Sequence, residues 1–249
     1  MAGHSKWANI KHRKAKVDAK RGKLWSKCSR AIIVAAKNGG PDPAANLTLR
    51  YAIDEARAAN MPKDTIERAI KKGAGEGAGE SYESIRYEGY GPSGVAVIVE
   101  CLSDNRNRTA GEIRMIFSKH GGNLGAVGCV GYMFESKGLI LIDEGAVSED
   151  KIMDLAISAG AEDVAHEDGV WAVRTAPEDF LGVKGAIEEA GIEMVSSEVT
   201  MESETMAELA GEDVAKTVRL IDALEDNDDV QKVYTNMDAS EADLDAAMA

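Results

Sequence analysis

The chain has 249 residues, of which 44% are hydrophobic and 29% are charged, a balance typical of a folded globular protein and not of a disordered one. No apolar run approaches the roughly 20 residues of a membrane-spanning helix, and no apolar stretch with a cleavage site follows the basic start, so we expect a cytoplasmic protein. The cysteines Cys28, Cys101 and Cys129 are odd in number and widely spaced, which favours buried thiols over disulfides or a metal site.

The net charge of −14 hides an asymmetry along the chain. Residues 1–80 hold 17 Lys and Arg against 8 Asp and Glu, whereas the remainder holds 12 against 35. Residues 1–37 contain eleven basic residues and a single acid, Asp18. This pattern predicts an anion-binding module joined to acidic domains. The alternative is that the basic segment only neutralises the acidic domains in the folded protein.

Three helices are predicted in the first 72 residues. Apolar residues recur near the 3.6-residue period in 17–38 and in 42–60, and Pro62 suits the first turn of a third helix ending at Lys72. Such a bundle can carry long basic side chains on one solvated face. The run 73–79 has the glycine-rich composition of a linker, so the first domain is assigned to residues 1–80.

From residue 82 the pattern changes to strands mixed with helices. Strands are expected at 85–90, 95–102 and 130–135, with a helix at 109–120. Then follow, in the order β-α-β-β-α-β, segments 139–143, 148–159, 163–167, 170–174, 177–190 and 193–201. A helix at 212–224 and a strand at 230–236 come last, and the tail after Asp238 is expected to fray.

This order of elements predicts an α+β fold with an N-terminal three-helix domain and two ferredoxin-like α/β domains, one inserted into the other. The β-α-β-β-α-β succession is that of a split βαβ domain. It gives an inserted domain at 137–202 and a discontinuous domain made of 81–136 plus 203–249.

The basic N-terminal run is the strongest functional signal. Clustered Lys and Arg neutralise phosphates and release counterions, which gives salt-sensitive binding to nucleic acid. The aromatic ring in this run could stack on a base or anchor the segment to the helical bundle. The nucleic-acid-binding candidates here are Lys6, Trp7, Lys11, His12, Arg13, Lys14, Lys16, Lys20, Arg21, Lys23 and Lys27.

Two further candidates, Arg106 and Arg108, lie between a strand and a helix that Asp104 or Asn107 could cap. Their guanidinium groups could bind phosphate through paired hydrogen bonds. The alternative is a structural loop whose arginines pair with the acidic domains.

Several segments resemble the YebC family, which includes the mitochondrial translational activator of cytochrome c oxidase. The opening Gly3-His4-Ser5-Lys6-Trp7-Ala8-Asn9-Ile10-Lys11-His12-Arg13-Lys14 carries the resemblance, with Asn60-Met61-Pro62-Lys63-Asp64, Tyr87-Glu88-Gly89-Tyr90-Gly91-Pro92, Asp104-Asn105-Arg106-Asn107-Arg108-Thr109 and Gly121-Gly122-Asn123-Leu124-Gly125. The resemblance implies three domains, one helical and two α/β. It also implies one of two roles: a DNA-binding transcriptional regulator, or a translation factor that relieves ribosome stalls at proline-rich stretches.

Enzymatic motifs are missing from the sequence. There is no phosphate-binding loop, zinc-protease motif or nucleophile elbow, and His4, His12, His120 and His166 lack metal-ligand spacing. We therefore expect a protein that is not an enzyme and that binds no cofactor, metal ion, membrane or small-molecule substrate.

The expected partner is nucleic acid, either ribosomal RNA on the ribosome or DNA. The third predicted helix is short and carries Asp64 and Glu67, which weighs against reading the DNA major groove and favours the ribosome. The rival from another class is a protein-interaction scaffold in which the basic end is incidental.

Overall fold

The computed structural model describes residues 21–75 and 82–248, with the side chains of residues 21 and 22 left out. Predictions on residues 1–20 and 76–81 lie outside the described residues. In the helical unit, α2 (Arg21–Gly39), α3 (Leu47–Ala58) and α4 (Lys63–Gly73) pack around one apolar core. Ile32, Leu49 and Ile66 are among its buried side chains.

The helix α3 begins five residues later than predicted. Asn46 precedes it, and its side chain accepts a hydrogen bond from the Leu49 amide at 3.1 Å and donates to the carbonyls of Ala35 and Gly40 at 2.8 Å. Capping by this buried amide fixes where α3 starts. Pro62 likewise stands directly before α4 and not in its first turn.

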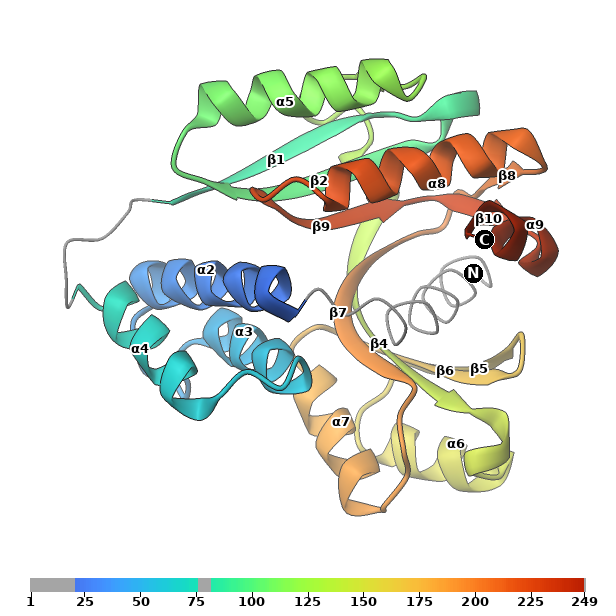
Figure 1. The fold of residues 1–249 in the computed structure, drawn as a ribbon. Helices are drawn as coiled ribbons and strands as arrows, with labels where there is room; N and C mark the ends of the chain where they lie inside the picture. The colour runs from blue at the N-terminus through green and yellow to red at the C-terminus, as the bar shows by residue number, and fades with distance from the viewer. Residues whose placement is uncertain (1–20, 76–81, 249) are drawn as a thin grey trace.

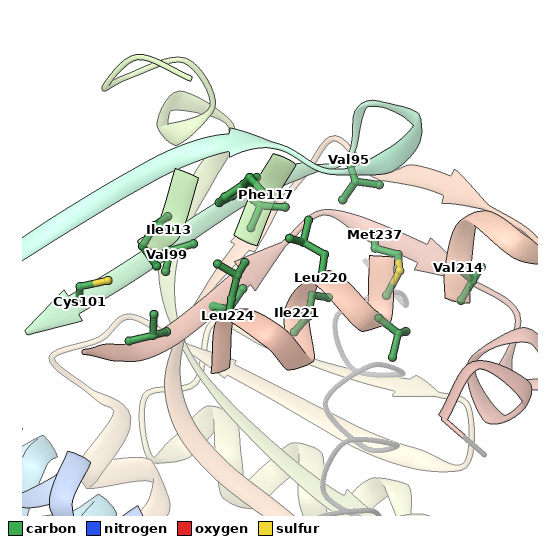
Figure 2. Packing of buried hydrophobic residues seen from close by; sticks show 14 of the residues in the cluster. Val95, Val99, Cys101, Ile113, Phe117, Val214, Leu220, Ile221, Leu224 and Met237 are labelled. Carbon is green, nitrogen blue, oxygen red and sulfur yellow. The ribbon is translucent and has the colours of Figure 1, made fainter. Parts of the chain in front are cut away.

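The first sheet is antiparallel in the order β3-β1-β2-β9, and α5 and α8 cover one face (Figure 1). Figure 2 shows Ile113 and Phe117 of α5 in the same layer as Val99 of β2 and Leu220 and Leu224 of α8. The bounds are β1 (Glu83–Tyr90), β2 (Ala96–Ser103), α5 (Arg106–Lys119), β3 (Asn123–Leu124), α8 (Glu212–Glu225) and β9 (Val230–Thr235), with short turns η1 (Pro92–Gly94) and η2 (Gly131–Met133).

The second sheet has the order β5-β6-β4-β7, with α6 and α7 on one face. Its bounds are β4 (Phe134–Asp143), η3 (Glu144–Ala146), α6 (Glu149–Ser158), β5 (Asp163–Glu167), β6 (Val170–Thr175), α7 (Phe180–Glu189) and β7 (Ser196–Ser203). The chain leaves the first sheet, builds the second and returns to add β9. The predicted α+β class with one α/β domain inserted into the other is thus confirmed. The inserted sheet has the ferredoxin-like order, whereas the hairpin β1–β2 occupies the centre of the other sheet.

The prediction of separate strands at 130–135 and 139–143 is wrong. A single strand, β4, runs through Ser136-Lys137-Gly138 and pairs with β7 from Phe134↔Ser203 to Leu141↔Ser196. Gly138 does not form a turn. A glycine is needed there because an added Cβ would lie 2.3 Å from Thr175 Oγ1 and 2.8 Å from Phe180. The proposed domain boundaries at 136/137 and 202/203 fall inside β4 and β7, and they stay a prediction.

The prediction that the tail after Asp238 frays is also wrong. The strands β8 (Ala207–Leu209) and β10 (Met237–Ala239) form a parallel pair, and the helix α9 (Glu241–Met248) follows. Leu244 of α9 is 1% exposed and joins the core of the first sheet. One leucine in an acidic, alanine-rich segment gives too weak a periodic signal to predict this helix.

The helical unit contacts the inserted domain directly. Lys184 of α7 donates hydrogen bonds of 2.7 and 2.9 Å to the carboxylate of Asp54 in α3. The Tyr51 hydroxyl donates to the carbonyl of Pro177, and its ring lies edge-on to Phe180 at 6.2 Å. These contacts fix one side of α3 against the inserted sheet domain.

Candidate nucleic-acid interface

Four of the predicted nucleic-acid-binding side chains lie within the described residues: Lys23, Lys27, Arg106 and Arg108. Arg21 begins α2, but its side chain is not described. The remaining candidates, which all fall outside the described residues, are Lys6, Trp7, Lys11, His12, Arg13, Lys14, Lys16 and Lys20.

Three cations share one side of α2 because they are four and then three residues apart. Lys27 Nζ donates to the carbonyl of Glu225 at 2.7 Å, and Lys23 donates to that of Asp226. Arg30 donates to the carbonyl of Asp228. Arg30 is not among the residues predicted from the sequence, although its spacing from Lys23 and Lys27 could have identified it.

The partner of these cations is the segment 225–229, here called the acidic turn, which joins α8 to β9. Besides its carbonyls it offers carboxylates: Lys23 Nζ lies 3.6 Å from Asp226 and 3.4 Å from Asp228. The turn also contains the C-terminal end of α8, where the helix dipole concentrates partial negative charge. In this conformation Lys23, Lys27 and Arg30 therefore neutralise an acidic part of the same chain.

Arg108 belongs to the same cluster. Its Nη2 donates to Asp229 Oδ2 at 2.7 Å and to Asp104 Oδ1 at 2.9 Å. The buried Asp229 also accepts hydrogen bonds from the hydroxyls of Thr109 and Ser103 at 2.7 and 3.1 Å. Burial alone would raise the pKa of Asp229, but the hydrogen bonds from Arg108, Thr109 and Ser103 outweigh it and hold the pKa below its ordinary value.

Arg106 behaves differently from Arg108. Its side chain is exposed, and within 21–75 and 82–248 its guanidinium has no hydrogen bond or ion pair. The predicted caps of the following helix, Asp104 and Asn107, are wrong. Asn105 caps α5 by accepting from the Arg108 amide at 3.1 Å, so the helix starts at Arg106, three residues earlier than predicted.

A cleft of about 530 Å³ lies between α2, the start of α5 and the acidic turn. Its walls carry both signs of charge, with Lys23, Arg30 and Arg108 facing several carboxylates. The Arg30 guanidinium also lies 5.7 Å from the centre of the Tyr82 ring. The cleft therefore lies where the helical unit meets the first sheet domain, and side chains of both charges line it.

The three cysteines are free. Burial raises the pKa of the Cys28 thiol to about 11 and that of Cys101 to about 12, so both stay protonated at neutral pH. No group of three or more His, Cys, Asp or Glu in the described part of the chain is arranged to hold a metal ion. None of the helices in that part combines the length and apolar character needed to cross a bilayer.

Together these features define a three-part protein in which a basic helical unit packs against two acidic α/β domains. The chain belongs to the TACO1/YebC family. Residues 5–76 match the TACO1/YebC protein N-terminal domain, and residues 82–237 match the TACO1/YebC second and third domain. The resemblance noted in the sequence is confirmed.

Relatives of similar length support this assignment. A Persephonella marina protein is 55% identical over 97% of both chains, and a Geobacter sulfurreducens protein is 52% identical over the full length of both. Each is described as a probable transcriptional regulatory protein. The crystal structure of a conserved hypothetical protein from Aquifex aeolicus, 49% identical, covers 91% of this chain and 93% of its own with a TM-score of 0.78.

Proposed function

We propose that the protein is a non-enzymatic, nucleic-acid-binding regulatory factor that acts in the cytoplasm on the ribosome and relieves stalls at proline-rich stretches. Its basic helical unit and the preceding basic run contact the phosphates of ribosomal RNA. The acidic α/β domains orient that unit. The relatives described as regulatory proteins support the general class.

The observation that carries the proposal is the row of cations on α2. Lys23, Lys27 and Arg30 bind a surface that resembles a nucleic-acid backbone, since it combines negative charge with closely spaced acceptor oxygens. A polyanion can take the place of the acidic turn only if the helical unit separates from it. Nucleic-acid binding is thus expected to compete with this internal contact.

RNA is favoured over DNA by the shape and charge of the helical unit. Its third helix, α4, carries Asp64 and Glu67, and Glu67 lies 3.8 Å from Lys63. Such a helix is poorly suited to entering a major groove, whereas backbone contacts suffice for structured RNA. A DNA-binding transcriptional regulator is the second candidate, because the relatives are described as probable transcriptional regulatory proteins.

The basic run can be tested by changing Lys11, Arg13, Lys14 and Lys16 to Ala in the full chain. Affinity for ribosomes should fall. The slope of the logarithm of affinity against the logarithm of salt concentration should become shallower by about four, one for each charge removed. A control that removes two positive charges changes Lys151 and Arg219, exposed cations of the α/β domains, to Ala and should bind as the parent does. Unchanged affinity in the fourfold variant would contradict the basic-face mechanism.

The target can be identified by crosslinking in cells followed by sequencing of recovered RNA and DNA. Ribosomal RNA near the peptidyl-transferase region, together with faster in vitro synthesis of a proline-rich reporter, supports the translation factor. Promoter DNA without ribosomal RNA supports the transcriptional regulator instead. If neither is recovered and removal of residues 1–80 leaves activity intact, the protein is an interaction scaffold.

A further inference from the structure

The outer face of α5 has no described element packed over it, and Figure 1 shows this helix at the edge of the molecule. Its inner face buries Ile113 and Phe117. The outer residues are all exposed: Asn107, Gly111, Arg114, Met115, Ser118 and Lys119, with Arg106 at the start of the helix. This face is therefore available to a partner.

The charge of α5 is opposite to that of the domains around it. Residues 81–249 hold 12 basic residues against 35 acidic ones, yet α5 alone carries Arg106, Arg108, Arg114 and Lys119. Its single acid, Glu112, accepts a hydrogen bond from the Asn227 amide at 2.7 Å. A third of the cations of the acidic part are thus concentrated on one helix.

Three of these cations are not used by the fold. In the described part of the chain, Arg106, Arg114 and Lys119 have no hydrogen bond or ion pair through their side chains. Most other cations of the same domains pair, for example Lys137 with Glu162 at 3.0 Å and Lys184 with Asp54 at 2.7 Å. In the described residues Lys151 of α6 and Arg219 of α8 likewise have no side-chain partner, but each lies on a different helix from the other. Unpaired cations in so acidic a molecule leave a surface that attracts an external anion.

Gly111 is a second, independent observation. It lies in the middle of α5, where glycine is a poor helix former, and an added Cβ would meet nothing within 4 Å. The fold therefore does not require a glycine here, and alanine would stabilise the helix. Gly111 is four residues after Asn107 and three before Arg114, so it lies on the same exposed face. A glycine at this point lets a partner approach the helix main chain closely.

We propose that the outer face of α5 is a second RNA-binding surface, in which Arg114 and Lys119 contact the phosphate backbone of structured RNA beside Gly111, and Arg106 adds a contact at the N-terminal end of the helix. The helix presents these charges over about 20 Å, and they suit backbone contacts and not base reading. The inference rests on the proposed function, since it concerns the same ligand. It adds a contact from the acidic part of the chain that lies away from the basic N-terminal run.

The charge contribution is tested with Arg114→Ala combined with Lys119→Ala, measured against a ribosomal RNA hairpin across a salt series. Affinity should fall about tenfold at low salt, and the salt slope should decrease by about two. The control is Lys151→Ala with Arg219→Ala, which removes the same charge from elsewhere in the α/β domains and should bind as the parent does. Equal losses in both double variants would show only a general charge effect and overturn the α5 surface.

Close approach is tested with Gly111→Ala. This change should raise the melting temperature, because alanine favours the helix, while RNA affinity falls. Gly182→Ala in α7 is the matched control, since a Cβ there also meets nothing within 4 Å. It should raise the melting temperature without changing RNA affinity. A Gly111→Ala protein that is more stable and binds RNA unchanged would overturn the inference.

These experiments distinguish a failure of the proposed RNA-binding function from a failure of the α5 surface alone. A parent chain that binds no RNA in a salt-dependent way contradicts the proposed function itself. A parent chain that binds, loses binding with the fourfold N-terminal variant and keeps it with the α5 variants contradicts the α5 surface alone.

Discussion

Lys232 of β9 donates a hydrogen bond to the carboxylate of Glu55 in α3, a residue 177 positions earlier in the chain. The same ammonium donates to the carbonyl of Val199 at 3.1 Å and to Glu198 at 3.4 Å, both in β7. Burial alone would lower the pKa of Lys232, but Glu55 and Glu198 outweigh it and raise the pKa. One side chain thus connects the helical unit with both sheets.

Lys232→Met should loosen this junction, because it leaves two carboxylates facing each other without a cation. We expect a loss of about 1–3 kcal/mol in the free energy of unfolding, measured with urea, together with a larger radius in small-angle scattering. Lys216→Met removes a more exposed lysine that pairs only within α8, so its cost should stay below about 0.5 kcal/mol. Similar losses in both variants would count against the junction.

Asp229→Asn should make stability less dependent on pH. The folded-state pKa of Asp229 lies below its ordinary value, so its stabilising effect is present above about pH 4 and is lost as the pH falls through the folded-state pKa. We expect the free energy of unfolding to fall by about 1–3 kcal/mol at pH 7. The difference from the parent should become smaller below about pH 4. Asp228→Asn alters a side chain that is 75% exposed and should change little. If the difference in unfolding free energy between Asp229→Asn and the parent stays constant with pH, the charge of Asp229 is not involved.

The periodic segments of the chain could be predicted from sequence because burial on one face dictates their pattern. The strand β2 and the helix α8 lie within a residue of their expected bounds. The continuity of β4 could not be predicted, because Gly138 is read locally as a turn and its packing against Thr175 involves a distant strand. Short caps such as Asn105 are also settled by contacts and not by periodicity.

For the candidate interface, sequence could give the sign of the charge but not its partner. Lys23 is basic in any conformation, yet its contact with Asp226 joins residues 203 positions apart. The different surroundings of Arg106 and Arg108 depend on the placement of Asp229, which is 121 positions from Arg108 in the sequence. A charge pattern therefore predicts an anion-binding surface without showing which cations the fold already occupies.

Glu88→Gln should release the turn that precedes β4. The carboxylate of Glu88 is 4% exposed and accepts hydrogen bonds from the amides of Val130 and Gly131 at 3.0 and 2.7 Å. A neutral amide is a weaker acceptor, so we expect the free energy of unfolding to fall by about 1–2 kcal/mol. Hydrogen exchange at Val130 and Gly131 should become faster, whereas the exposed Glu83→Gln variant should leave both rates unchanged.

Leu244→Ala should destabilise the first sheet domain, although the residue stands five positions from the end of the sequence. Leu244 is 1% exposed, and removing a buried leucine costs about 2–4 kcal/mol, measurable by urea unfolding. Asp245→Ala alters an exposed neighbour and should stay within about 0.5 kcal/mol of the parent. An unchanged free energy of unfolding in Leu244→Ala would indicate instead that the tail after Asp238 frays.

The position of β9 sets the order in which the protein can fold during its own synthesis. All four strands of the inserted sheet emerge from the ribosome before residue 230, so that domain can form first. The other sheet waits for α8 and β9, which supply much of its core, including Leu220 and Val233. Lys232 follows at once and joins the three parts. A chain that ends shortly before residue 230 would hold a folded inserted domain beside an open first sheet.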